Sequence, residues 1–136
     1  MDNLLSQLPG YALRRAANTA MTRFTAMLAP LDVKITEAAI FMLIRESANL
    51  TSSKIGKELE IQRANMVPML QRMEDAGWIQ REAIDGKSQA IVLTAEGRTK
   101  AEEVAQTVEQ FEAELLHRVP AQHRKHLLPA LNAIWN

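Results

Sequence analysis

Residues 62–94 read QRANMVPMLQRMEDAGWIQREAIDGKSQAIVLT, and the other segments of the chain are best understood around them. From residue 62 to residue 76 the apolar side chains recur at the spacing of one helix face, and Gly77 follows at a position that often ends a helix. An Asp-Gly pair at 85–86 is a favoured turn sequence between two strands. The stretch therefore predicts a helix and then a two-stranded hairpin, with strands at 78–84 and 89–94.

A shorter helix is predicted immediately before this stretch. Thr51 can cap a helix over residues 52–59, and residues 60–62 then form a turn. Such turns often hold glycine, but Glu60 stands at that position here. Helix, turn, helix and hairpin in this order are typical of a winged helix-turn-helix, which places its second helix in the major groove of DNA.

The flanking segments add four more helices. Residues 36–46, with Thr36 as the N-cap, are apolar nearly all round, which predicts a central helix. The predicted fold is mainly α with a small β-hairpin between the fourth and fifth of six helices. We expect residues 35–94 to form the DNA-binding region and residues 1–34 and 95–136 a helical dimerisation region, within a single integrated domain. The remaining three helices are predicted at 11–28, at 95–118 with Thr94 as the N-cap, and from Pro120 onward.

Apolar positions outside the central motif predict a dimer. In the helix at 95–118 they recur at alternating spacings of three and four, which requires a facing helix. That helix can come from the same chain or from a partner, and we expect both. A two-fold symmetric dimer would present two helix-turn-helix motifs to the two half-sites of a DNA sequence. The expected dimer interface comprises Leu4, Leu5, Leu8, Val108, Phe111, Leu115, Leu127, Leu128, Leu131 and Trp135.

Composition narrows the function classes. The chain has 136 residues, a net charge of zero and no cysteine, which excludes disulfides, thiolate metal sites and thiol-based redox sensing. No apolar run is long enough to span a membrane and no signal peptide is visible, so we expect a cytoplasmic protein. Charge is unevenly distributed, with a net +2 over residues 51–72 and −5 over residues 101–116. The positive excess gives only small support for nucleic-acid binding.

One face of the helix at 62–76 carries small, amide and basic side chains. Asn and Gln pair with adenine and Arg pairs with guanine or phosphate, although a solvated surface would have a similar composition. Pro68 removes one backbone hydrogen bond, so we expect a kink there. Arg72 is the residue we expect to read a base. The candidate DNA-binding residues are Ser52, Ser53, Lys54, Arg63, Ala64, Asn65, Pro68, Gln71, Arg72, Lys87 and Ser88.

Three segments resemble the MarR family of transcriptional regulators. MLQRMEDAGWIQR at residues 69–81 is similar to the end of that family's recognition helix and its first wing strand. DGKS at 85–88, followed by LTAEG at 93–97, resembles its wing motif, and LAPL at 28–31 resembles the end of its first helix. Lys87 stands where the family usually has Arg. Pro68 is shared with the peroxide-sensing branch, whose sensing cysteine is absent from this chain.

The resemblance implies an obligate homodimer that represses transcription from a palindromic double-stranded DNA operator. It also implies release by a small phenolic or aromatic effector, such as a carboxylate or its CoA thioester. We expect no cofactor. A pocket for the effector is predicted from Tyr11, Arg14, Asn18, Phe41 and Met42, each of which could instead serve packing or the surface.

Three alternatives to a DNA-binding repressor have to be weighed. His117, His123 and His126 could hold a metal in a metal-responsive regulator, but they stand among basic residues and more often form a solvated face. A winged helix that binds only proteins would also fit the neutral net charge. An enzyme is disfavoured, because the chain has no phosphate-binding loop, nucleophile elbow or His-Glu-x-x-His motif.

Overall fold

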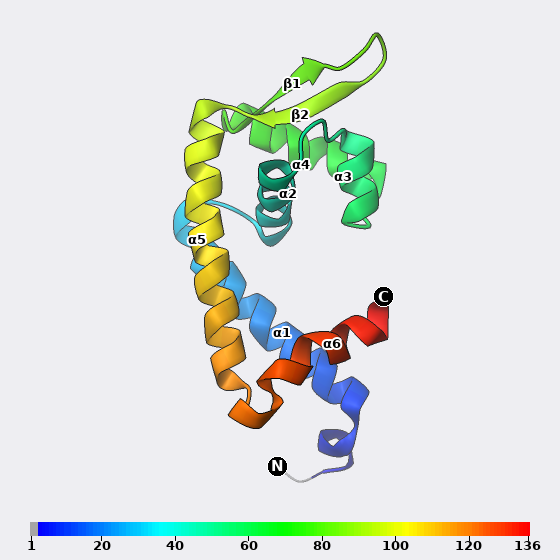
Figure 1. The fold of residues 1–136 in the computed structure, drawn as a ribbon, viewed down its shortest axis with the longest axis vertical. Coiled ribbons are helices and arrows are strands. Elements are labelled where there is room, and N and C mark those ends of the chain that lie inside the picture. The colour runs from blue at the N-terminus through cyan, green and yellow to red at the C-terminus, as the bar shows by residue number, and fades with distance from the viewer. Residues whose placement is uncertain (1–2) are drawn as a thin grey trace.

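A computed structural model describes residues 3–136 and has the shape of a head on a long leg (Figure 1). The leg pairs α1 (Pro9–Leu28) with α5 (Ala95–Arg118), and α6 (Arg124–Trp135) follows at the far end. The head contains α2 (Ile35–Glu46), α3 (Ser52–Glu58), α4 (Arg63–Asp75) and the antiparallel strands β1 (Ile79–Ala83) and β2 (Gln89–Leu93). The predicted fold class and element order are confirmed. Short 3₁₀ turns occur at Leu4–Gln7, Ala29–Leu31 and Ala121–His123.

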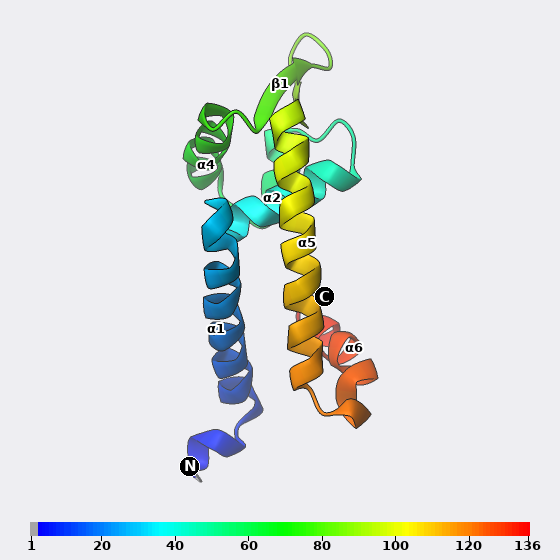
Figure 2. The same cartoon turned by 90° about the vertical axis from the view of Figure 1, so that its left-hand side faces the viewer.

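The two helices of the leg run side by side in opposite directions (Figure 2). Their contact is centred on Phe24 and Phe111, whose rings stack with centroids 4.5 Å apart. The apolar positions of α5 thus find their facing helix within the same chain. The assignment of Phe111 to the dimer interface is therefore wrong, because α1 already buries its ring.

Helix α2 lies at the centre of the head, as its sequence predicted. Ile40 and Phe41 are fully buried, and the Phe41 ring packs 5.4 Å from the ring of Trp78. The helix begins earlier than expected, with Lys34 rather than Thr36 as its N-cap. The reason is Glu37, whose Oε1 accepts the Lys34 N–H at 2.8 Å and satisfies a backbone donor of the first turn.

The hairpin joins the head to the leg through a close backbone contact. Gly77 ends α4 with a positive φ of 82°, and the Thr94 N–H donates to the Trp78 carbonyl at 3.0 Å. A Cβ at Gly97 would stand 1.8 Å from that same carbonyl oxygen. Only glycine allows α5 to begin so near the first strand, so the wing and the leg are held in a fixed relation.

The tip of the hairpin differs from the predicted two-residue turn. Five residues, 84–88, separate the strands, and Gly86 is not among the residues with positive φ. The Asp85 Oδ1 instead accepts the N–H groups of Lys87 and Ser88, both at 2.8 Å. An aspartate that bonds its own loop backbone in this way stabilises a wider turn. These two bonds hold the pKa of Asp85 below its ordinary value.

The turn between α3 and α4 contains a strained residue. Glu60 has a φ of 54°, in the left-handed region that costs a residue with a side chain about 1–2 kcal/mol. This is the position where the sequence departs from the glycine usual in such turns. Glu60 at this position therefore lowers the stability of the folded chain.

We expect Glu60→Gly to raise the free energy of unfolding by about 0.5–1 kcal/mol, because relief of strain exceeds the added entropy of the unfolded chain. Urea denaturation of both proteins measures the difference. Gln106→Gly is the control: this exposed residue lies in the interior of α5, so the substitution should lower stability by about 1 kcal/mol. A lower midpoint for Glu60→Gly would contradict the argument.

Candidate nucleic-acid interface

Helices α3 and α4 form the edge of the head, with a groove of about 360 Å³ between them. Ser52, Ser53, Lys57 and Arg63 are among its lining residues. The Thr51 side chain accepts the Lys54 N–H at 3.2 Å, which confirms the predicted N-cap of α3. The exposed Lys54 and Arg63 side chains place positive charge beside the groove. A polyanion could lie along this edge.

The outer face of α4 carries both polar and apolar side chains and is not uniformly basic. Met66, Leu70 and Met73 are buried on the inner face, and the helix continues through Pro68. The predicted residues Ala64, Asn65, Pro68 and Gln71 are all exposed. Val67 is 57% exposed on the same helix, a residue that the sequence reasoning missed.

Arg72 does not belong to this exposed face. Its Nη1 donates to Glu37 Oε1 at 2.6 Å, and its Nη2 donates to the carbonyl and the carboxylate of Asp32 at 3.1 and 3.2 Å. Its position along the helix predicts an outward side chain, but the long side chain bends back to the buried carboxylate of Glu37. The expectation that Arg72 reads a base is therefore wrong for this conformation.

The wing carries the remaining candidates. Lys87 is exposed at the tip of the hairpin, and Ser88 beside it is partly buried. Gln80, Glu82 and Gln89 on the two strands are exposed, while Ile91 is buried against the head. A single basic side chain at the tip can reach a phosphate or a minor groove.

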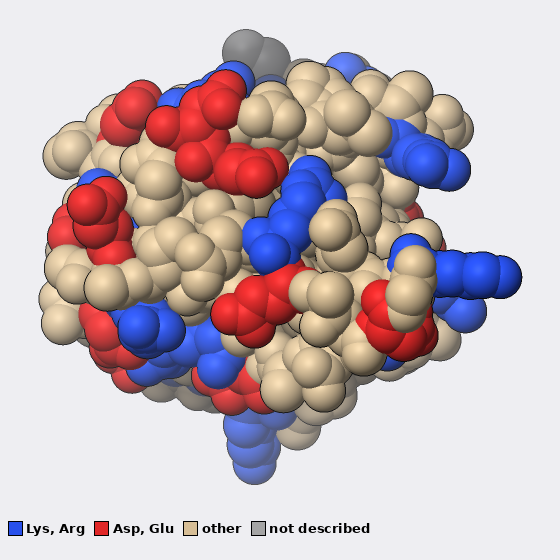
Figure 3. Space-filling model, turned by 90° about the horizontal axis from the view of Figure 1, so that it is seen from above, with Lys and Arg blue, Asp and Glu red and all other residues tan. Residues whose placement is uncertain are grey.

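Positive charge on this end of the molecule is distributed rather than continuous. Figure 3 shows Lys and Arg side chains projecting at several points of the head, with acidic side chains between them. Several acidic groups are neutralised locally, as in the pairs Arg81–Glu74 and Arg45–Glu102. The electrostatic attraction to a nucleic acid must therefore come from a few exposed cations.

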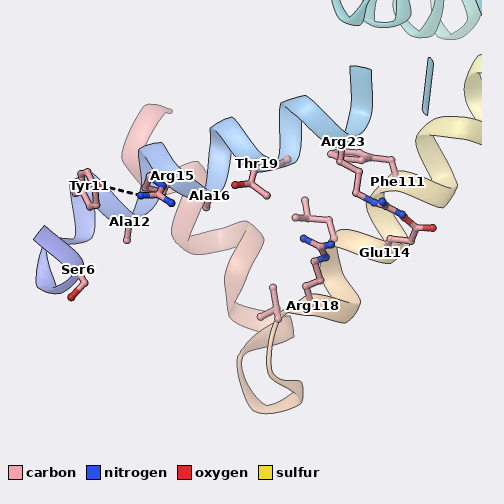
Figure 4. Close-up of a pocket in the computed structure, with 13 residues that line it drawn as sticks. Ser6, Tyr11, Ala12, Arg15, Ala16, Thr19, Arg23, Phe111, Glu114 and Arg118 are labelled. Carbon is pink, nitrogen blue, oxygen red and sulfur yellow. Dashed lines mark hydrogen bonds and ion pairs between the residues drawn. The ribbon is translucent and has the colours of Figure 1, made fainter. Parts of the chain in front are cut away.

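The predicted effector pocket is not assembled as expected. Phe41 is buried in the head. Asn18 and Tyr11 line two separate grooves, and Arg14 lines neither of them. Tyr11 does line a groove of about 570 Å³ between α1 and α5 (Figure 4). Its floor is mostly apolar, and Arg15, Arg23 and Arg118 stand around it. Spacing along α1 could not identify Arg118, because it comes from the end of α5.

Apolar surface remains uncovered at both ends of the described chain. No residue of α6 is buried, and Leu128 and Trp135 are 66% and 75% exposed. Leu4, Leu5 and Leu8 are exposed, as are Leu13 and Met21 on α1. Val108, Leu115, Leu127 and Leu131 are partly buried. Monomeric proteins rarely leave so much apolar surface unpaired.

Known proteins with the same arrangement identify the family. The model of the MarR family matches residues 33–87. The organic hydroperoxide resistance transcriptional regulator of Bacillus subtilis is 30% identical over 99 residues, which cover 68% of this chain and 67% of that protein. The chain belongs to the MarR family.

Two further proteins, Rv2887 and CouR, support the assignment to the MarR family. The transcriptional repressor Rv2887 of Mycobacterium tuberculosis is 28% identical over 118 residues, 85% of each chain. One of its structures is a complex with salicylic acid, with a TM-score of 0.73 at 26% identity over 93% of this chain and 96% of that one.

The repressor CouR bound to a 23-mer DNA duplex has a TM-score of 0.88 at 28% identity over 97% and 95% of the two chains. CouR bound to p-coumaroyl-CoA has a TM-score of 0.86 at 27% identity over 98% and 96%.

The structure also bears on a metal site and on membrane spans in this MarR-family chain. Across residues 3–136 no group of three His, Asp or Glu residues is placed to hold a metal ion, and His117, His123 and His126 are exposed. The helices of that same part of the chain are too short or too polar to cross a membrane.

Proposed function

We propose that this protein is a homodimeric transcriptional repressor that binds palindromic double-stranded DNA and is released by a small aromatic effector. The observation that carries the proposal is the near-complete match in fold to a DNA-bound repressor, together with an exposed outer face on α4. Because DNA is its proposed partner, we place the protein in the cytoplasm.

The proposed DNA contacts divide into positioning and reading groups. Ser52, Ser53, Lys54 and Arg63 face the phosphate backbone at the edge formed by α3 and α4, and Lys87 and Ser88 extend the contact from the wing. Ala64, Asn65, Pro68 and Gln71 enter the major groove, where the two amides pair with adenine. The Gln71 amide donates to Asp75 at 2.9 Å and must exchange that bond for a base.

Salt dependence tests the DNA-binding proposal. Operator affinity should fall steeply with salt, and Lys54→Ala and Arg63→Ala should each reduce the slope of log K against log salt by about one. Asn65→Ala should leave the slope unchanged and lower preference between sequences by about 1–3 kcal/mol. Fluorescence anisotropy with labelled duplexes measures all three.

Lys125→Ala, an exposed lysine at the other end of the molecule, is the control and should bind like the parent. If the parent protein binds no duplex at low salt, the repressor proposal fails. A winged helix that binds protein partners, favoured by the mixed charge of the head, would then be the better account.

The dimer rests on the apolar surface that the single chain does not cover. Helix α6 presents Leu127, Leu128, Leu131 and Trp135 at helical spacing; the first and third are partly buried and the other two are exposed. The first turns of the chain add Leu4, Leu5 and Leu8. A self-complementary contact between two copies buries this surface and gives the two-fold symmetry that a palindrome requires.

We expect Leu128→Glu to convert the dimer into a monomer and to abolish tight operator binding, because a charge would be buried at the interface. Ala133→Glu, on the opposite face of α6, is the matched control and should remain dimeric. Sedimentation velocity measures the mass of each. A dimeric Leu128→Glu protein would remove α6 from the interface.

For the effector, the groove between α1 and α5 offers a suitable site. Its volume of about 570 Å³ lies within the usual range for small-molecule pockets. Arg23 is paired with Glu114, and Arg15 donates to Tyr11 at 3.0 Å. The Arg118 side chain makes no hydrogen bond or ion pair within residues 3–136, and it is directed into the groove (Figure 4). We assign it the carboxylate of an aromatic acid or the phosphates of its thioester.

We expect Arg118→Gln to retain operator binding but to need about tenfold more effector for release, because one charge-assisted bond is lost. A thermal-shift screen of aromatic acids and their CoA thioesters supplies the effector, and anisotropy measures release. Arg98→Gln, an exposed arginine outside the groove, should leave the effector response unchanged. An unchanged response of Arg118→Gln would place the effector elsewhere.

A further inference from the structure

A buried carboxylate in the head has no role in the proposed DNA or effector sites. The Glu37 side chain is 0% exposed, and within residues 3–136 it is the sole charged or polar residue in the buried class. Placing a carboxylate in the protein interior is costly unless opposite charge and hydrogen bonds compensate it. The structure supplies both, so the groups that surround Glu37 must be held in place.

Three segments converge on this carboxylate. Glu37 belongs to the first turn of α2, where its Oε1 accepts the Lys34 N–H at 2.8 Å. The Arg72 Nη1 approaches from α4 and donates to Oε1 at 2.6 Å and to Oε2 as well. The Arg72 Nη2 then reaches the carbonyl and Oδ1 of Asp32, in the connection between α1 and α2.

The same joint includes the start of the wing. The Arg72 guanidinium carbon lies 5.9 Å from the centroid of the Trp78 ring, within the range of a cation–π contact. The Lys100 Nζ lies 5.6 Å from that centroid and donates to the Leu31 carbonyl at 3.2 Å. Trp78, the residue before β1, is thus contacted by one cation from α4 and one from α5.

We propose that Arg72 is a positioning residue and not a DNA contact: its guanidinium, held by Glu37, Asp32 and Trp78, sets the angle of α4 relative to the end of α1. This inference rests on the proposed function. The angle of α4 determines whether the two α4 helices of a dimer fit successive major grooves of DNA. A displacement at the end of α1 would reach α4 through Asp32 and Arg72.

Two observations favour positioning over phosphate binding. The guanidinium already donates to four acceptor positions, and its side chain is only 32% exposed. Withdrawing it toward DNA would leave Glu37 buried with its charge unpaired, which is strongly unfavourable. A lysine cannot replace it, because one ammonium group cannot reproduce the planar fork that bridges two acceptors.

The test compares Arg72→Lys with Arg81→Lys in the full-length protein. Arg81 is a matched control, since its side chain is also 32% exposed and pairs with Glu74 on α4. We expect Arg72→Lys to weaken operator binding about threefold to thirtyfold. The salt slope should stay at the parent value, because a phosphate contact is not lost. Arg81→Lys should bind like the parent.

Glu37→Gln provides a second variant that cannot touch DNA. It keeps the acceptor for the Lys34 N–H but removes the charge that holds Arg72, so it should weaken operator binding to a similar extent. The double variant Glu37→Gln/Arg72→Lys should lose no more than either single one, since both break one joint. Circular dichroism and sedimentation confirm that each variant is folded and dimeric before binding is compared.

A spectroscopic readout separates a shifted joint from a general loss of stability. The protein has two tryptophans, so the indole N–H signals of Trp78 and Trp135 can be distinguished by NMR. Arg72→Lys and Glu37→Gln should shift the Trp78 signal and leave Trp135 unchanged.

Parent-like affinity of Arg72→Lys, or a salt slope reduced by about one in Arg72→Gln, would overturn the positioning role and restore a phosphate contact. Absence of DNA binding by the parent protein would instead contradict the proposed function.

Discussion

The backbone contact between Gly97 and the carbonyl of Trp78 is the constraint on which the geometry of this protein depends. It fixes the start of α5 against the start of β1, and Gly77 brings the end of α4 to the same place. Helix α4, the β1–β2 hairpin and helix α5 are therefore joined within a few residues of one another. Side chains stabilise this junction: the Phe41 ring packs at a tilt against the Trp78 ring, and Arg72 and Lys100 lie over the Trp78 ring.

Local patterns were sufficient to predict the elements of the fold. Thr51 and Thr94 cap their helices as expected, and the periodicity of α4 identified its buried face correctly. These features depend on residues within a few positions of each other, which a sequence displays directly. The cap of α2 was misplaced because Glu37, three residues into that segment, provided the hydrogen bond instead of Thr36.

The candidate sites were less predictable, because they depend on contacts between distant segments. Helical spacing placed Arg72 outward, but it could not reveal a buried carboxylate 35 positions earlier in the chain. Phe111 has the spacing of an interface residue, yet α1 already covers it through Phe24. Phe41 is buried in the head, away from Tyr11, and Arg14 does not line the groove that Tyr11 lines, although Arg14 and Tyr11 both belong to α1. In each case a long side chain or a tertiary contact overrode the local pattern.

The exposed apolar face of α6 has a consequence for the lifetime of the protein. A helix that buries none of its residues adds little to the stability of a lone chain, because packing supplies most of a helix's stability in water. A newly made chain would therefore present an apolar, loosely held C-terminal segment to proteases and chaperones until it finds a second copy. In the dimer that we propose, the same segment is covered. Abundance would then follow assembly, so that cells retain paired molecules and remove single ones.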